Sequence, residues 1–591
     1  MAPIKSTVMS RRDLEFLLFE WLAVDELTKR SRFAEHSRET FADVLDLCED
    51  LATRYFAPHN KKSDQNEPSF DGTTVTVIPE VKQAIDAFAA ADLLGMTMDH
   101  ALGGSQLPVS VAQAGFAWFS AANVSTSGYL MLTVANANLV SKFGSPEQIE
   151  RFVKPMLAGR FTGTMALSEP QAGSSLADIT TRAEPGGDGG YRLFGSKMWI
   201  SGAEHEMSEN IVHLVLAKIP GGPPGTKGIS LFIVPKFLVE DDGSVGPRND
   251  VAISGLNHKM GQRGITNTVL NFNGAVGYLV GEPHRGIVYM FHMMNEARLG
   301  VGMGAVALGY TGYLKSLQYA LERPQGRPIT SKDPTSPQVP IVEHADVKRM
   351  LLAQKSLRGR GARPRPVLRP TGRPAGQRRV RRRARAGGAA VGHLDSDRQE
   401  LALAVVSGGQ QSGHPGARRI RLHPRIRRRA ALPRQPAQPD SRGHPRDPEP
   451  GSAGPQVTQR DGASLVALGG CITECIDAAD NVGGESAELA AALGGSWQRL
   501  VEVTMAMFGS GDVEAAMANS AVYLEAFGHI VIAWMWLEQF LAAGDQPGDF
   551  YDGKRQAARY FFRYELPRTA AQLRLLESLD RTTLEMRPDW F

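Results

Sequence analysis

The 591-residue chain contains only three cysteines. So few cysteines exclude a disulfide-stabilised fold and are typical of a reducing compartment. Cys471 and Cys475 are four residues apart, which places them on one face of a predicted helix. There is no second pair to complete four metal ligands, so we interpret both as small buried apolar residues and predict no metal site.

The sequence also has few signals for targeting to a membrane or for nucleotide-binding loops. Residues 1–11 lack the apolar core of a signal peptide, and no apolar run approaches the roughly 20 residues of a membrane span. We find no Gly-rich dinucleotide turn and no phosphate-binding loop of the Walker type. The sequence therefore predicts a soluble, cytoplasmic protein without a membrane span.

Residues 357–455 lack Lys, Phe, Tyr, Trp, Met and Cys, yet they hold 23 Arg and only 6 Asp plus Glu. The rest of the chain has 43 Lys plus Arg against 56 Asp plus Glu, so the net charge of +4 hides an acidic protein. Arginine-rich arms usually include Lys, and a core needs aromatic residues. We interpret this segment as translation in a shifted reading frame and expect it to be disordered.

Hydrophobic periodicity divides the remaining chain into helical and β-rich parts. We predict an N-terminal helical domain over 1–160, a central β domain over 161–283 and the first part of a helical bundle over 284–356. The anomalous segment spans 357–456, and an extra helical domain spans 457–591. Because helices and strands are segregated, the predicted class is α+β multidomain rather than a doubly wound parallel sheet.

Local signals mark several elements within these parts. Ser145 precedes Pro146 and is followed by Gln148, a pattern that predicts a capped helix start. Short β-rich runs begin at Tyr191, Ile211 and Ile229. Residues 522–540 form an apolar helical run whose two tryptophans, Trp534 and Trp536, we expect in a core.

Two strings in the β-rich part carry the chemical signal. Residues 161–175 (FTGTMALSEPQAGSS) alternate apolar residues with small hydroxyl side chains and then turn at Gly173. Residues 197–202 (KMWISG) place a large aromatic plane beside a hydroxyl. Taken singly, Trp199 is more often a core residue and Ser168 more often a strand hydroxyl bonded to its own sheet. Together, such strand ends offer N–H groups and hydroxyls to a flat polar ring.

These strings resemble middle-domain signatures of the acyl-CoA dehydrogenase family, and further motifs agree in order. They are LGG at 102–104, FGSPEQ at 143–148, KMGQRG at 259–264, ARL at 297–299 and ERPQG at 322–326, the last without the family's Phe. The resemblance covers about residues 11–355. The helical block after 457 resembles the extra C-terminal domain of the family's longer branch, of roughly 600 residues.

The resemblance implies an FAD enzyme that desaturates an acyl-CoA thioester between its α and β carbons. The backbone of Met165 and Leu167 and the hydroxyl of Ser168 would bind the pyrimidine edge of the flavin. Trp199 would pack against the ring, and Ser201 would lie near the flavin N5 atom, where hydride arrives.

The resemblance also implies substrate and subunit contacts. Arg323 and Gln325 would reach the FAD pyrophosphate of a neighbouring subunit, so a homodimer or homotetramer is expected. Ser174 would contact coenzyme A, and Arg298 would border the thioester pocket. Ser175 stands where the family usually has Asp, which weakens the resemblance at that turn. The usual electron acceptor in the family is an electron-transferring flavoprotein.

The general base that this reaction requires is missing from the printed sequence. Most family members use a Glu in an EGT-like motif, and others place it directly before the Arg of ERL, which here is Ala297. Glu296 is one residue before that position, which is a rotation of about 100° around a helix. With suitable synonymous codons, a one-base shift turns residues 439–448 into PIHEGTHGIQ, with the Glu codon read across Arg442 and Gly443. The same shift gives IQVHGGYGYTREYDVE from residues 414–429.

Two other interpretations stay open. The arginine clusters at 381–383 and 427–429 are typical of a nucleic-acid-binding protein, but no aromatic residues are interleaved to stack bases. If residues 357–455 are authentic, the chain is an inactive remnant of its family and we expect no turnover. Short, branched, long-chain and thioether acyl groups all remain possible substrates.

Overall fold

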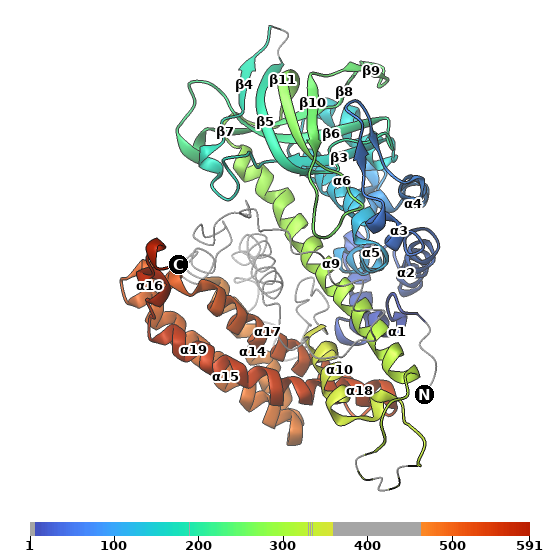
Figure 1. The fold of residues 1–591 in the computed structure, drawn as a ribbon, viewed down its shortest axis with the longest axis vertical. Coiled ribbons are helices and arrows are strands. Elements are labelled where there is room, and N and C mark those ends of the chain that lie inside the picture. Colours follow the sequence, from blue (N-terminus) through green and yellow to red (C-terminus); the bar gives the residue numbers. More distant parts are fainter. Residues whose placement is uncertain (1–5, 188–189, 329, 331–332, 334, 359–462) are drawn as a thin grey trace, which may run out of the picture.

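The computed structural model describes residues 6–187, 190–328, 330, 333, 335–358 and 463–591. Figure 1 shows the β-sheet at the top, the N-terminal helices beside it, and the C-terminal helices along the bottom. One long helix, α9 (Gly286–Glu322), runs from the sheet to the lower helices. The predicted α+β class with segregated helical and β parts is confirmed.

The N-terminal part is helical, as expected. Its longer helices pack around a core that includes Phe41, Phe88 and Trp118. The predicted capping box at Ser145 is confirmed, because its hydroxyl accepts from the N–H of Gln148 and the Gln148 amide oxygen accepts in return. The helices are α1 (Arg11–Glu15), α2 (Arg38–Leu51), α3 (Asn60–Gln65), α4 (Pro79–Ala90), α5 (Val109–Ala122), α6 (Val124–Phe143), α7 (Pro146–Gln148) and α8 (Lys154–Leu157).

The central sheet has seven strands in the order β10-β11-β5-β4-β6-β3, with β7 pairing to both β11 and β6 so that the sheet closes on itself. Only β3 and β4 run parallel to their neighbour β6; the other pairs are antiparallel. The strands are β3 (Phe161–Ala166), β4 (Arg182–Pro185), β5 (Tyr191–Ser201), β6 (Asn210–Lys218), β7 (Ile229–Pro235), β10 (Val251–Leu256) and β11 (Asn267–Leu279). Short pairs β1 (Ser69–Phe70) with β2 (Val75–Thr76) and β8 (Phe237–Val239) with β9 (Val245–Arg248) lie outside it.

Helix α9 begins against β7, where Gly286 approaches the backbone of Ser230 and Leu231 too closely for any Cβ. Its 37 residues extend about 55 Å at 1.5 Å per residue. A proline-rich loop then leads to α10 (Ala345–Arg358). Both helices match the helical pattern expected between Gly286 and Lys355.

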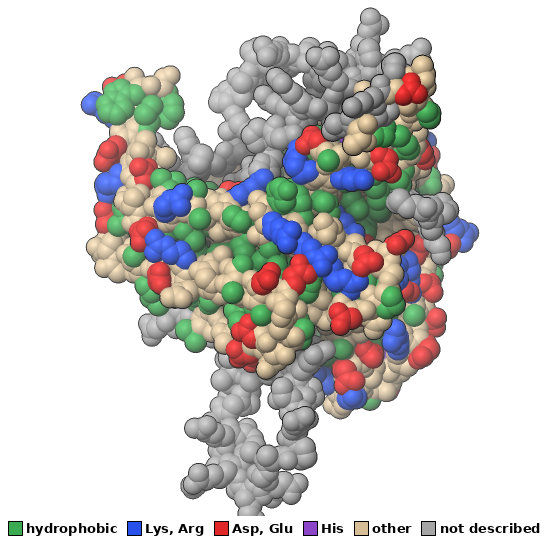
Figure 2. All heavy atoms as spheres, turned by 90° about the horizontal axis from the view of Figure 1, so that it is seen from below, with side chains coloured by type: hydrophobic (Ala, Val, Ile, Leu, Met, Phe, Trp, Pro, Cys, Tyr) green, Lys and Arg blue, Asp and Glu red, His purple; other side chains and the backbone are tan. Residues whose placement is uncertain are grey.

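The C-terminal helices form a separate core in which Trp534 and Trp536 are buried, as predicted. Cys475 is buried and Cys471 half-buried. Acidic and basic side chains are interspersed on the lower face of the molecule (Figure 2). The helices are α14 (Ala463–Val482), α15 (Gly484–Gly509), α16 (Val513–Ala518), α17 (Ser520–Ala543), α18 (Asp549–Tyr560), α19 (Thr569–Glu577) and α20 (Thr582–Glu585).

The expectation that no segment reaches membrane length needs correction at α17. This 24-residue helix is long and apolar enough to cross a membrane by length and composition alone. Of its most apolar window, 72% is buried inside the protein. Core helices of soluble proteins pass the same test, because burial selects for the same side chains as lipid does.

The chain's two ends meet in this structure. Phe16, in a π-helical segment after α1, contacts the rings of Phe550 and Tyr551 of α18 at centroid distances of 5.6 and 6.3 Å. The Trp21 indole donates to a Glu538 carboxylate oxygen at 3.1 Å. The N-terminal segment therefore packs directly on the extra C-terminal helices. Arg442, Gly443 and both arginine clusters of the anomalous segment lie outside the described residues.

Candidate functional site

A buried ion pair joins the end of β3 to β5. The Lys197 ammonium donates to the carbonyl of Leu167 and to a carboxylate oxygen of Glu169, each at 2.9 Å. Both charged side chains are excluded from solvent, at 0% and 1% exposure. The N–H and hydroxyl groups of Thr180 and Thr181 also donate to this carboxylate. Lys197 thus fixes the backbone next to Ser168.

Burial and the partner's charge shift the pKa of each group in opposite directions, and a different one of the two prevails in each group. Burial alone would raise the pKa of Glu169, but the Lys197 ammonium and the hydrogen bonds from Thr180 and Thr181 outweigh it and hold that pKa at about 2. Burial lowers the pKa of Lys197 to about 8, against the pull of the carboxylate. Both groups are therefore charged at neutral pH.

Trp199 is not a core residue. Its φ of +64° lies in the left-handed region, and 42% of its surface is exposed. The pairing of β5 with β11 shifts register here, between Ile200 opposite Thr268 and Lys197 opposite Leu270. Such a bulge re-aims a side chain, and a non-glycine residue in this conformation costs on the order of 1–3 kcal/mol. Strain of this kind is concentrated at functional sites, so the bulge singles out this position.

The other residues expected at the flavin lie around this bulge. The Met198 N–H donates to the Ser168 carbonyl at 2.9 Å, which brings Ser168 beside Trp199. Met165 is in β3 opposite Leu214, and Leu167 follows the strand end. The two β segments named by the sequence therefore do converge.

Ser201 is the last residue of β5, two residues after Trp199. It pairs with Asn267, whose amide nitrogen donates to the Ser201 hydroxyl oxygen at 3.0 Å. Gly202, directly after it, has a φ of +70°, which turns the chain away from the strand. The serine hydroxyl is thus held at the strand end by its neighbour.

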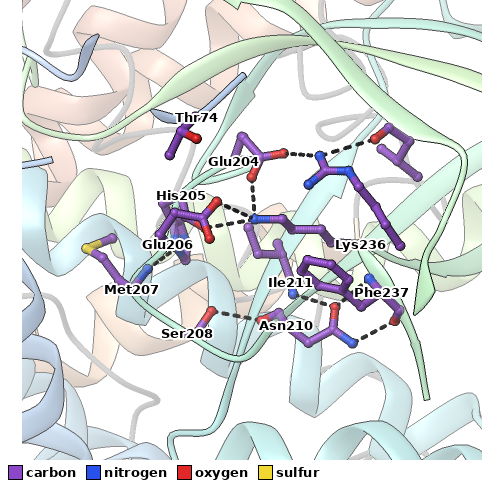
Figure 3. Close-up of polar contacts among 12 residues, drawn as sticks. Thr74, Glu204, His205, Glu206, Met207, Ser208, Asn210, Ile211, Lys236 and Phe237 are labelled. Atoms are coloured by element: carbon purple, nitrogen blue, oxygen red, sulfur yellow. Dashed lines mark hydrogen bonds and ion pairs between the residues drawn. The ribbon is translucent and has the colours of Figure 1, made fainter. Parts of the chain in front are cut away.

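A second charge cluster, in which Lys236 and Glu204 are buried, fixes the loop after Ser201 (Figure 3). Lys236, at 2% exposure, pairs with the carboxylates of Glu204 at 2.5 Å and Glu206 at 3.0 Å and donates to the His205 carbonyl at 3.1 Å. Arg248 pairs with the other Glu204 oxygen at 2.9 Å. Burial, with the nearby Lys236 ammonium, lowers the pKa of His205 to about 3, so this imidazole is neutral.

The turn that carries Ser174 lies between an isolated bridge, Glu169 to Ala172, and a 3-10 segment at Leu176. Ser174 is half-buried, and its carbonyl accepts from the Leu176 N–H at 3.2 Å. The Ser175 hydroxyl donates to the Asp178 carboxylate. A carboxylate is therefore present at this turn, although three residues later than the family's Asp.

A mostly apolar cavity of about 300 Å³ lies between α5, α6 and α9. Gly300, Val301 and Gly304 of α9 line it, whereas Arg298 does not. The Arg298 guanidinium donates to the Asn295 side chain at 3.2 Å, half a turn before the cavity. Small residues on α9 leave room that larger side chains would fill. The other lining residues are Phe116, Ser120, Val124, Ser127, Gly128, Met131, Gln262, Ala305 and Leu308.

Glu296 lies one turn from this cavity and points to α6. Its carboxylate accepts from the Asn138 amide at 3.0 Å, and the His292 imidazole is 3.8 Å away. Burial raises the pKa of Glu296 to about 7, which the Asn138 hydrogen bond opposes. Ala297 is buried, and it supplies no acid in place of the family's Glu.

Arg323 and Gln325 are exposed and lie just past the end of α9. Figure 1 shows that α9 begins at the sheet and ends among the lower helices, and its length is about 55 Å, so both residues lie far from the end of α9 that touches the sheet. The structure therefore does not bring these two residues to the strand ends of their own chain.

Comparison with known families identifies three domains in this chain. Residues 38–160 match the acyl-CoA dehydrogenase N-terminal domain, residues 164–275 the middle domain, and residues 469–587 an acetyl-CoA dehydrogenase C-terminal-like domain. The chain belongs to the acyl-CoA dehydrogenase family. The matched middle domain contains Met165, Ser168 and Trp199.

Several curated relatives of the family are more than 30% identical to this chain over the matched residues. A 3-methylmercaptopropionyl-CoA dehydrogenase of Ruegeria pomeroyi is 35% identical over 350 residues, and a broad-specificity linear acyl-CoA dehydrogenase of Mycobacterium tuberculosis is 38% identical over 354 residues. Each match covers 58% of this chain and 58% of the relative's length.

Two solved acyl-CoA dehydrogenase-like structures extend over nearly the whole chain. Caenorhabditis elegans ACDH-11 in complex with C11-CoA covers 94% of this chain and 90% of its own, with a TM-score of 0.62 and 15% identity. A Bacillus anthracis acyl-CoA dehydrogenase complexed with FAD covers 94% and 93%, with a TM-score of 0.59 and 17% identity. These likenesses show the shared fold.

Sequence reasoning missed the groups that hold the site together. Lys197 and Glu169 both lie inside the strings quoted for their motifs, and only their burial reveals the pair. The sequence signal that could have indicated a buried charge was a charged residue among apolar neighbours in a predicted strand. Lys236 gives the same signal directly after the apolar strand β7.

Proposed function

We propose that this protein is an FAD-dependent acyl-CoA dehydrogenase that desaturates an acyl-CoA thioester between its α and β carbons. The observation that carries the proposal is the strained, exposed Trp199 beside Ser168, within a matched middle domain. When bound, FAD supplies the acceptor for the two electrons that leave the substrate.

The chain's own residues fit a flavin at this rim. The backbone of Met165 and Leu167 and the hydroxyl of Ser168 bind the polar edge of the ring, and Trp199 covers its face. Ser201 holds the reacting side of the ring with a hydroxyl that Asn267 orients. The fit rests on the donor set and on Lys197, which fixes the backbone next to Ser168 by donating to the Leu167 carbonyl.

Substrate binding is assigned to two regions. Ser174 at the exposed turn contacts coenzyme A, and the apolar cavity between α6 and α9 takes the acyl chain. Arg298 borders the thioester from half a turn before the cavity. Most of the side chains that line the cavity are apolar, which favours hydrocarbon chains.

The distance along α9 supports an oligomeric assembly. Arg323 and Gln325 bind the FAD pyrophosphate of a neighbouring subunit, so the protein is a homodimer or homotetramer. Exposed apolar side chains at Val301, Leu308 and Tyr319, 41–46% exposed, recur on one face of α9 and support a covering layer there. We place the protein in the cytoplasm and take an electron-transferring flavoprotein as its acceptor.

The general base is the Glu whose codon is read across Arg442 and Gly443 in the shifted frame. The two buried carboxylates described near the site are engaged elsewhere: Glu296 is bonded to Asn138, and Glu169 is paired with Lys197. A base in a water-poor pocket has its pKa raised toward the working pH, as catalysis of α-proton removal requires. The chain as printed lacks this group and is expected not to turn over.

The deciding experiment is mass spectrometry of a non-tryptic digest covering residues 350–460. Peptides with the IQVHGGYGY and HEGTHGIQ readings support the shifted frame, and that protein should then bleach its flavin with acyl-CoA. Changing the Glu of HEGT to Gln should remove the bleaching while the flavin stays bound. Peptides with the arginine-rich sequence would contradict the proposal of an active enzyme.

A matched pair of variants tests the flavin site separately. Trp199→Ala and Ser168→Ala should lower flavin occupancy, measured by absorbance near 450 nm. Met260→Ala, at an exposed methionine, should leave occupancy unchanged. Equal flavin content in all three proteins would sink the assignment of this rim.

A further inference from the structure

The cavity between α5, α6 and α9 lies beside the rim of the sheet that carries Ser201. Tyr129 of α6 lies against Gly202, the residue after Ser201, where an added Cβ would be 3.4 Å from the tyrosine ring. The Tyr129 hydroxyl accepts from the Thr266 N–H at 2.9 Å. Gly128, directly before Tyr129, lines the cavity. One segment of α6 therefore borders both the rim and the cavity.

Two glycines of α9 face this cavity from the same side of the helix. Gly300 and Gly304 are four residues apart, so they lie one above the other. A Cβ on Gly300 would be 2.5 Å from the Met131 sulfur, which leaves no room unless the methionine shifts. Of the described residues outside this helix, only Val124 would come within 4 Å of a Cβ on Gly304, at 3.7 Å. Gly300 thus allows α6 and α9 to approach, whereas Gly304 leaves space open.

The cavity has a direction and a limited size. Because α9 begins at the sheet, the Gly300 end of the cavity is the one nearer the rim (Figure 1). Leu308, one turn beyond Gly304, is the last residue of α9 that lines it. A cavity of about 150 Å³ holds the six carbons of benzene, so this cavity of about 300 Å³ holds about twelve carbon atoms at most.

We propose that the cavity selects straight acyl chains of medium length, about six to ten carbons, and that Gly304 sets this limit. The inference rests on the proposed function, because it names the substrate class of that same site. A shorter chain leaves the part beyond Gly304 empty, and an empty apolar cavity loses the contacts that a longer chain makes. Carbons beyond the filled length find no further wall and add little to binding.

The test is calorimetric titration of the full chain with butanoyl-, hexanoyl-, octanoyl-, decanoyl- and hexadecanoyl-CoA, with coenzyme A alone as the reference. The affinity should rise by up to about fourfold for each carbon added, as far as decanoyl-CoA. From decanoyl- to hexadecanoyl-CoA it should change by less than about twofold, because the cavity is already full.

A graded pair of variants tests the assignment of Gly304. Gly304→Leu fills the space beyond this residue and should weaken decanoyl-CoA binding about tenfold, while butanoyl-CoA binds within about twofold of the parent. Gly304→Ala should have a smaller effect in the same direction. Both replacements favour the helix over glycine, so the fold is kept. Gly470→Leu is the matched control on α14, where nothing lies within 4 Å of an added Cβ, and should bind every acyl-CoA as the parent does.

The outcomes separate this inference from the proposed reaction when flavin content is measured by absorbance on the same samples. An affinity independent of chain length, or equal losses for butanoyl- and decanoyl-CoA in Gly304→Leu, would overturn the inference. Flavin bound without any acyl-CoA binding would also overturn it and leave the flavin site standing. The expected chain-length dependence in a protein that cannot hold flavin would instead support the inference and overturn the proposed reaction.

Discussion

At the residue scale, the site depends on side chains that never reach a ligand. Lys197 spans from β5 to the carbonyl of Leu167 and to Glu169, so one ammonium orders two strand ends. Removing one partner of a buried pair leaves the other charge uncompensated, at a cost of about 3–5 kcal/mol. The pair is therefore a structural requirement of the flavin rim even though it performs no chemistry.

Lys197→Met should lower the free energy of unfolding by about 3 kcal/mol, because the Glu169 carboxylate stays buried. Lys197→Met combined with Glu169→Gln should lose less than the sum of the single variants. Urea unfolding followed by circular dichroism gives these values. Lys82→Met, which breaks an exposed pair with Asp86, should change stability by less than about 1 kcal/mol; equal losses at both lysines would contradict the prediction.

The same pair predicts a dependence on pH. The folded-state pKa of Glu169, about 2, lies below its ordinary value of 4.5. Its ionised form therefore stabilises the fold above about pH 4.5, and this contribution is lost as the pH falls toward 2. The stability gap between the parent and Glu169→Gln should narrow over that window. A gap that is constant between pH 7 and pH 3 would refute the assignment.

At the element scale, Gly163 of β3 allows α6 to pack closely on this strand. A Cβ on Gly163 would lie 2.7 Å from the Asn136 side chain. That asparagine is buried and donates to the carbonyls of Thr164 and Val212, at 3.0 and 2.9 Å, so it cannot move aside freely. The strand that carries Met165 is thus held at a fixed distance from the helix.

Gly163→Ala should lower the free energy of unfolding by about 1–3 kcal/mol, because the methyl group overpacks this contact. Gly173→Ala is the matched control, since nothing lies within 4 Å of a Cβ at that turn. Thermal unfolding of both variants checks the difference. Equal melting temperatures would mean that α6 can retreat from the sheet.

At the scale of the whole molecule, the N-terminal segment joins the extra C-terminal helices to the rest. Phe16 is completely buried against Phe550 and Tyr551. The Arg12 guanidinium donates to Glu20 and Tyr551, and the Tyr551 hydroxyl donates to Glu20. These contacts connect residues more than 500 positions apart.

Phe16→Ala should destabilise this junction by about 3–5 kcal/mol, since it removes a fully buried aromatic ring. Limited proteolysis should then cut sooner within residues 6–22 and around α18. Phe591→Ala, at 95% exposure, should leave the digestion pattern unchanged. Digestion at the parent's rate in both variants would show that the two ends are held together by other contacts.

Much of the local structure was predictable because it is encoded by neighbouring residues. The capping box at Ser145, the strands at Tyr191, Ile211 and Ile229, and the buried Trp536 follow from spacing alone. The site was predictable only as two separate strings. Their convergence depends on β3 and β5 meeting at one rim, which hydrophobic periodicity does not encode.

The sequence by itself determined the segregation of helices and strands, the family motifs and the break at residue 357. The tertiary structure alone decided that Trp199 is exposed rather than buried, because a register shift between β5 and β11 turns it outward. It also decided that Lys197 pairs with Glu169 and that the chain's two ends pack together through Phe16 and Phe550. Such pairings depend on which distant side chains a packed fold brings within a few ångströms, and no local pattern along the chain specifies that.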